Sequence, residues 1–250
     1  MLANPAAKSA SHPGSGLCWR SRKLRALFRR LEAAYEEIDV VFAANGLSDV
    51  QLPIQVRRGV DDKHIELFES KVLPISWRDT GEAARDHFKG IEKHLGNGGL
   101  YGKAMKTLKQ PYTLLEDFQK AVFSKNLRAD MQAKQFVRRC VEPERDMIVF
   151  VSSMTPIQIK HKAINGITYH VREYALSKQA PLDSTPGRDL SLLQLCTRIS
   201  MECKPGVTFD AENIRSVARF WVGNIAGNLR CYQERIENAL LDQAVTSRAE

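Results

Sequence analysis

Residues 146–174 read DMIVFVSSMTPIQIKHKAINGITYHVREY, and this stretch carries the clearest β-sheet signals of the chain. Residues 147–151 form a short apolar run between polar residues, which is typical of a central strand. Asn165-Gly166 joins two segments of alternating polar and apolar residues, and this dipeptide favours a tight hairpin turn. The stretch therefore predicts a strand over 146–153 and a hairpin over 157–174.

A further strand is predicted over residues 50–57, where four apolar side chains alternate strictly with polar ones. Pro53 lies on the polar side of this pattern and has no backbone N–H to donate to a neighbouring strand. We therefore expect residues 50–57 to form an edge strand of a small antiparallel sheet.

Helical spacing of apolar residues is longest over about residues 210–244. Its stripe consists of Ile214, Val217, Trp221, Ile225, Leu229, Tyr232, Ile236 and Leu240. Gly223 and Gly227 lie one turn apart, where another backbone could approach closely. A helix of more than six turns is longer than one small sheet can cover. We therefore expect the half of the helix from Leu229 onward to contact other helices of the chain or a second copy.

Other segments also suggest helices. A second amphipathic helix is predicted over residues 19–38, and shorter helices over 61–73, 80–95, 103–110, 113–125, 129–140 and 189–202. The fold class that follows is α+β: a helix-rich single domain over 19–250 with a small antiparallel sheet and a long C-terminal helix. Residues 1–18 are predicted to be a disordered basic tail, and residues 100–140 a basic helical subregion.

Composition restricts the class of protein. The chain has 250 residues, of which 43% are hydrophobic, which argues against collagen-like and fully disordered proteins. The five cysteines are an odd number and form no Cys-x-x-Cys pair, so we expect free thiols in a reducing compartment and a cytoplasmic location. The acid-free start also resembles a transit peptide in composition, so translocation or organelle import is the alternative.

Positive charge is concentrated in two segments. The net charge is +8, yet residues 1–30 hold seven basic and no acidic side chains, and residues 101–140 hold nine basic and three acidic ones. The basic residues at the start of the predicted 19–38 helix oppose the helix dipole, so they do not stabilise that helix. We therefore expect them to contact an external partner, although a solvated basic face is the plainer interpretation of the second segment.

These segments predict phosphate contacts with DNA or RNA. The candidate nucleic-acid-binding residues are Arg20, Arg22, Lys23, Arg25, Arg29, Arg30, Lys103, Lys106, Lys109, Arg138 and Arg139.

Other motifs are incomplete. The glycine-rich stretch over 96–103 lacks the first glycine and the Ser or Thr of a phosphate-binding loop, since Asn97 and Ala104 occupy those positions. A two-residue hairpin turn would place His161 opposite His170, where the two could share a metal ion, but a bulged turn separates them. We predict no metal site and no cofactor, and the sequence leaves catalytic residues unknown.

The function predicted from the sequence is that of a nucleic-acid-binding accessory or regulatory protein. Two alternatives stay open. One is a translocated or imported protein whose body is an enzyme without recognisable motifs, and the other is an interaction protein that forms homodimers through its C-terminal helix.

Overall fold

A computed structural model describes residues 22–44, 46, 52–59, 62–89, 98–107, 112–159, 162–163, 166–181 and 189–246 of the chain. The tail predicted over residues 1–18 lies outside these ranges, and so do Arg20 and Lys109. Whether residues 19–250 form one domain stays a prediction.

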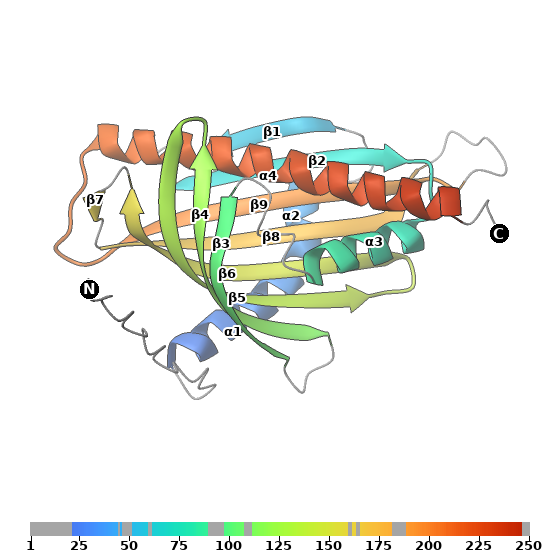
Figure 1. Ribbon diagram of the computed structural model, residues 1–250, viewed down its shortest axis with the longest axis horizontal. Helices are drawn as coiled ribbons and strands as arrows, with labels where there is room; N and C mark the ends of the chain where they lie inside the picture. The colour runs from blue at the N-terminus through green and yellow to red at the C-terminus, as the bar shows by residue number, and fades with distance from the viewer. Residues whose placement is uncertain are drawn as a thin grey trace, which may run out of the picture.

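The main element is a nine-stranded antiparallel sheet (Figure 1). The strands follow the order β1-β2-β9-β8-β6-β5-β4-β3, and the short β7 pairs with β6 beside this path. Their bounds are β1 (Leu52–Arg58), β2 (His64–Leu73), β3 (Gly98–Thr107), β4 (Thr113–Ser124), β5 (Leu127–Val141), β6 (Arg145–Ile159), β7 (Lys162–Ala163), β8 (Ile167–Gln179) and β9 (Ser191–Cys203).

The predicted small sheet in a helix-rich domain is therefore wrong. Five segments predicted as helices form strands: residues 61–73 contain β2, and residues 103–110, 113–125, 129–140 and 189–202 overlap β3, β4, β5 and β9. The basic subregion at 100–140 is likewise built from strands. β4 contains Leu, Glu, Gln, Lys and Ala, which favour helices, and both of its faces are largely covered, so its burial does not alternate.

The helices lie on opposite faces of the sheet. α1 (Arg22–Glu36) and α2 (Ile38–Ala44) cover what we call the outer face, whereas α3 (Trp77–Lys89) and α4 (Ala211–Thr246) cover the inner face (Figure 1). Alternate residues of β6 separate the two cores. Ile148 and Phe150 pack with α3 and α4, and Met147 and Val149 pack with α1 and α2.

The long C-terminal helix is confirmed as α4, and its apolar stripe packs on the sheet of the same chain. Trp221 is 4% exposed, and its ring lies 4.9 Å from that of Tyr169 on β8. Leu229 and Ile236 are buried in this core, so the described structure leaves neither side chain available to a second copy. None of the described helices combines the length and apolar character needed to cross a membrane.

The sheet register corrects the predicted hairpin. Residues 146–153 do form a strand within β6, but β6 pairs with β8 from Arg145↔Lys178 to Met154↔Tyr169, and β7 is inserted after β6. A two-residue turn at 165–166 would need a different register. The observed register places Tyr169 and Val171 on the same face as Phe150, where all three are buried.

The predicted strand at 50–57 is confirmed as β1, and it occupies one edge of the sheet. β3 forms the other end of the strand order. The outer face between α1 and β1 is the part of the fold that positions the candidate site.

Candidate anion-binding site

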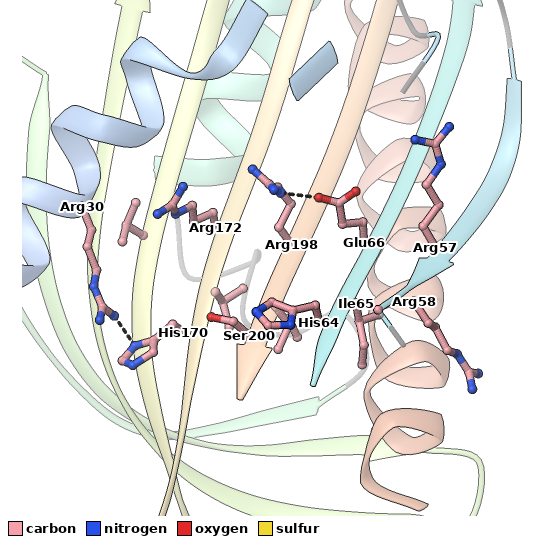
Figure 2. Close-up of a pocket in the computed structure, with 14 residues that line it drawn as sticks. Arg30, Arg57, Arg58, His64, Ile65, Glu66, His170, Arg172, Arg198 and Ser200 are labelled. Carbon is pink, nitrogen blue, oxygen red and sulfur yellow. Dashed lines mark hydrogen bonds and ion pairs between the residues drawn. The ribbon is translucent and has the colours of Figure 1, made fainter. Parts of the chain in front are cut away.

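A pocket of about 520 Å³ lies on the outer face of the sheet, between α1 and β1 (Figure 2). We call it the arginine pocket. It is lined by Arg30, Arg57, Arg58, Gly59, His64, Ile65, Glu66, Val151, His170, Val171, Arg172, Arg198, Ile199 and Ser200. Five arginines and two histidines face a single carboxylate among these lining residues, so the pocket is strongly basic.

Strand register brings these side chains together. Arg172 on β8 pairs with Arg198 on β9, Arg198 pairs with Glu66 on β2, and Glu66 pairs with Arg57 on β1. The four residues form a row across four adjacent strands. One step along the strands, His170, Ser200 and His64 form a second row, on the same face because side chains repeat every two residues.

Two arginines directly opposite each other repel, so the Arg172–Arg198 pair costs stability unless an acid compensates it. Glu37, between α1 and α2, supplies that acid. Its carboxylate pairs with Arg172 and lies 3.6 Å from Nη1 of Arg198. Nε of Arg198 also donates to Glu66 Oε1 at 2.5 Å. These contacts hold both guanidinium groups in place at the pocket wall.

His170 connects α1 to the sheet. A guanidinium can only donate hydrogen bonds, so Nδ1 of His170 accepts the hydrogen bond from Arg30. The other ring nitrogen, Nε2, then carries the proton and donates it to Glu202 Oε2 at 2.6 Å. This arrangement requires a neutral imidazole. Burial lowers the pKa of His170, the Glu202 hydrogen bond opposes that shift, and the positive charge of Arg30 adds to it.

The edge strand β1 contributes the opposite wall. Arg57 donates to the carbonyl of Ala44 at 3.0 Å, and its guanidinium lies 5.3 Å from the centre of the Phe68 ring. Arg58 lies 4.0 Å from Asp62. Among the residues that the structure describes, Arg30 and Arg57 form no direct ion pair with a carboxylate, and Glu202, on the other side of His170, interacts with Arg30 only at longer range.

A second pocket, of about 420 Å³, runs beside α1. We call it the α1 pocket. It is lined by Lys23, Leu24, Ala26, Leu27, Arg30, Gln132, Lys134, Ser153, Thr155, Thr168, His170 and Glu202. Both pockets include Arg30 and His170, so they meet at this pair. The hydrogen-bonded pair therefore stands between the two pockets, and we call the two pockets together the basic groove.

The structure divides the residues predicted from the sequence. Lys23 and Arg30 line the groove, while Arg22, Arg25 and Arg29 are exposed on α1, and no ion-pair partner of these three lies in the described ranges. Lys103 and Lys106 belong to β3, at the far end of the strand order, and their side chains are not described. Whether the two predicted basic segments form one site stays a prediction.

Arg138 and Arg139 have structural partners instead. Arg138 donates to both carboxylate oxygens of Glu32 on α1, at 2.9 and 2.7 Å. Arg139 points to the other face, where its Nε donates to Asp146 at 3.0 Å and its Nη2 to Glu82 at 2.6 Å. These pairs connect α1 and α3 to the sheet, which explains why two adjacent arginines occur on β5.

Sequence reasoning missed Arg57, Arg58, Arg172 and Arg198. A signal was present for two of them, since Arg57 occupies a polar position of the predicted edge strand and Arg172 one of the predicted hairpin. Arg198 was assigned to a helix. His161 of the tested metal pair lies outside the described residues, and the described ones contain no group of three or more His, Cys, Asp and Glu side chains placed to hold a metal ion.

Comparisons with known proteins give only distant similarity. No family model matches the chain, and no curated protein matches it. A conserved protein from Geobacillus kaustophilus matches 70% of this chain and 96% of its own at 11% identity, with a TM-score of 0.37. The protein TTHA0849 from Thermus thermophilus matches 70% of this chain and 98% of its own at 11% identity, with a TM-score of 0.39. Similarity at this distance carries no information about function.

Proposed function

We propose that the protein binds single-stranded nucleic acid through phosphate contacts along the basic groove. The observation that carries this proposal is the position of Arg30, which forms no direct ion pair with a carboxylate among the described residues and belongs to both pockets. A basic groove that follows the backbone is the usual way in which proteins bind single strands without reading sequence. We further propose a cytoplasmic location, where the described cysteines would remain free thiols.

The size of the two pockets favours a single strand. The arginine pocket, of about 520 Å³, reaches the edge strand β1, and the α1 pocket, of about 420 Å³, lies between α1 and strands β5, β6, β8 and β9, which suits one chain of a few nucleotides. Apart from the two histidines, the lining residues carry no aromatic ring on which bases could stack. We therefore expect weak sequence preference and affinity that depends mainly on charge.

The salt dependence of binding tests this proposal. Six basic side chains of the groove and of α1 have no carboxylate partner within the described ranges: Arg22, Lys23, Arg25, Arg29, Arg30 and Arg57. With about six phosphate contacts and a slope of about −0.7 for each, log K should fall with log salt at a slope of about −4. Fluorescence anisotropy of a labelled mixed-sequence oligonucleotide, titrated between about 50 and 200 mM salt, measures this slope.

Matched variants locate the binding surface. Arg30→Gln should reduce the slope by about 0.7 and weaken binding uniformly across sequences, as expected of a phosphate contact. Arg85→Gln is the control, because Arg85 is on α3 and pairs with Glu82 at 2.7 Å. A slope near zero, or equal losses in both variants, would contradict the proposal.

A further inference from the structure

We infer that the arginine pocket binds a phosphomonoester, that is, a terminal phosphate group with two negative charges. For a nucleic-acid strand this inference rests on the proposed function, with the strand lying in the α1 pocket and its phosphorylated end in the arginine pocket. The same chemistry is present in a free nucleotide. The pocket, the balance of charge and the place of the pocket in the groove each support this ligand class.

The guanidinium groups are held before any ligand arrives. Arg198 is fixed by Glu66 at 2.5 Å, Arg172 by Glu37, and Arg57 by the Ala44 carbonyl at 3.0 Å. Each guanidinium has five N–H donors, and these contacts use only one or two of them. Such fixed arginines can present several donors to phosphate oxygens with little loss of side-chain entropy.

The balance of charge suits a dianion. The five arginines of the pocket face three carboxylates that contact them directly, those of Glu37, Glu66 and Asp62, so two guanidinium charges have no carboxylate in direct contact. Glu202 lies beyond His170 and interacts with Arg30 at longer range. A phosphomonoester carries about −1.5 to −2 at pH 7 and three terminal oxygens, whereas a backbone phosphodiester carries a single charge. A monoester therefore neutralises the pocket more completely than a diester does.

The place of the pocket favours a chain end. β1 is the last strand at this side of the sheet, and its Arg57 lies opposite Arg30, whereas the side chain of Arg58 points away from the row of arginines (Figure 2). A strand that follows α1 reaches Arg30 first and then the arginine pocket, beyond which the sheet stops. Glu66 lies among the arginines, where its carboxylate can accept a hydrogen bond from a ribose hydroxyl or a base amine of the last nucleotide.

A comparison of oligonucleotide ends tests the inference. An oligonucleotide with a fluorophore at its 3′ end is prepared with either a 5′-phosphate or a 5′-hydroxyl, and the pair is titrated with the full-length protein. The matched pair with a 3′-phosphate or 3′-hydroxyl carries its fluorophore at the 5′ end. We expect one terminal phosphate to tighten binding about tenfold or more, because charge-assisted hydrogen bonds are added. Competition by adenosine monophosphate, with adenosine as control, tests the free nucleotide.

Variants connect the effect to the pocket. Arg57→Gln changes an exposed side chain of the pocket row and should reduce the advantage of the terminal phosphate to about twofold or less. Arg58→Gln changes the next side chain, which leaves β1 on the opposite face, and should reduce that advantage by a smaller factor. Arg85→Gln should leave it unchanged. Circular dichroism melting of each variant shows that the fold is retained.

The outcomes separate the two proposals. If oligonucleotides bind equally with and without terminal phosphates and adenosine monophosphate does not compete better than adenosine, the inference is wrong while the proposed function stands. If only the mononucleotide binds, the pocket takes a free phosphomonoester and the proposed function fails. If the terminal phosphate helps equally in Arg57→Gln, Arg58→Gln and the unaltered protein, the phosphate binds elsewhere and the inference is wrong.

Discussion

The contact between α4 and β4 gives a sharp test of the packing. Gly223 on α4 faces Ser124 at the end of β4, and a Cβ added at Gly223 would lie closer than 3.0 Å to the Ser124 hydroxyl oxygen. The Cβ of Ser124 would be at 3.5 Å, an ordinary van der Waals distance. The neighbouring Asn224 donates to the carbonyl of Phe123 at 2.8 Å, which fixes α4 against this strand end. The substitution Gly223→Ala therefore conflicts with one oxygen atom.

The expected magnitudes follow from two opposing effects. Overpacking a well-filled site costs about 1–3 kcal/mol, whereas replacing glycine by alanine inside a helix stabilises by about 0.8–1.0 kcal/mol. Gly223→Ala alone should thus lower the free energy of unfolding by about 0–2 kcal/mol. In a Ser124→Ala background the conflicting oxygen is absent, so the same substitution should raise the free energy of unfolding by about 0.8–1.0 kcal/mol.

Urea denaturation followed by circular dichroism measures all four proteins: the unaltered chain, each single variant and the double variant. The double-mutant cycle should give a coupling free energy of about 1–3 kcal/mol. If Gly223→Ala stabilises the protein equally with and without the Ser124 hydroxyl, α4 does not approach β4 as closely as the structure places it, and the reasoning is refuted.

Three further predictions concern stability. Arg139→Gln leaves the carboxylate of Asp146 buried without its partner, so the free energy of unfolding measured by urea titration should fall by about 3–5 kcal/mol. Nucleic-acid binding should be unchanged. His170 has a lowered pKa in the folded state, so the unfolded chain binds more protons below about pH 6.5 and stability should fall as pH falls. His170→Gln should flatten that part of the profile of melting temperature against pH, and an unchanged profile would refute the role of this histidine. Trp221→Ala should lower the free energy of unfolding by about 3–5 kcal/mol, and a decrease below about 1 kcal/mol would show that this ring is not in the core.

Among the strands that sequence reasoning assigned to helices, β2, β4 and β9 have buried residues on both faces. In β9, Leu192 and Leu193 are both buried, although their side chains point to opposite faces of the sheet. Apolar residues at consecutive positions remove the alternation that identifies a strand. The remaining polar residues then fall at spacings that resemble those of a helix. The number of strands could therefore not be read from local patterns.

The candidate site was predictable only in part. Lys23 and Arg30 stood out because they belong to an acid-free segment, and Lys23 also opposes the helix dipole; both line the groove. Arg172 and Arg198 are 26 positions apart and become neighbours only through the pairing of β8 with β9. Arg138 and Arg139 were predicted as phosphate contacts, and in the structure they bond Glu32, Glu82 and Asp146. These three carboxylates come from separate segments, so local sequence patterns do not reveal the pairs.

By itself, the sequence determined α1 and α4, because each of these helices has one face in the core and one face toward solvent, and the edge strand β1, whose Ile54 packs against the inner core while its polar residues are exposed. One-sided burial produces a period in the order of residues, and that period can be read locally. Only the tertiary structure decided the size of the sheet and the row Arg172, Arg198, Glu66 and Arg57. Strand pairing joins residues far apart in the chain, and the register that aligns them is chosen by burial of the whole sheet between two layers of helices.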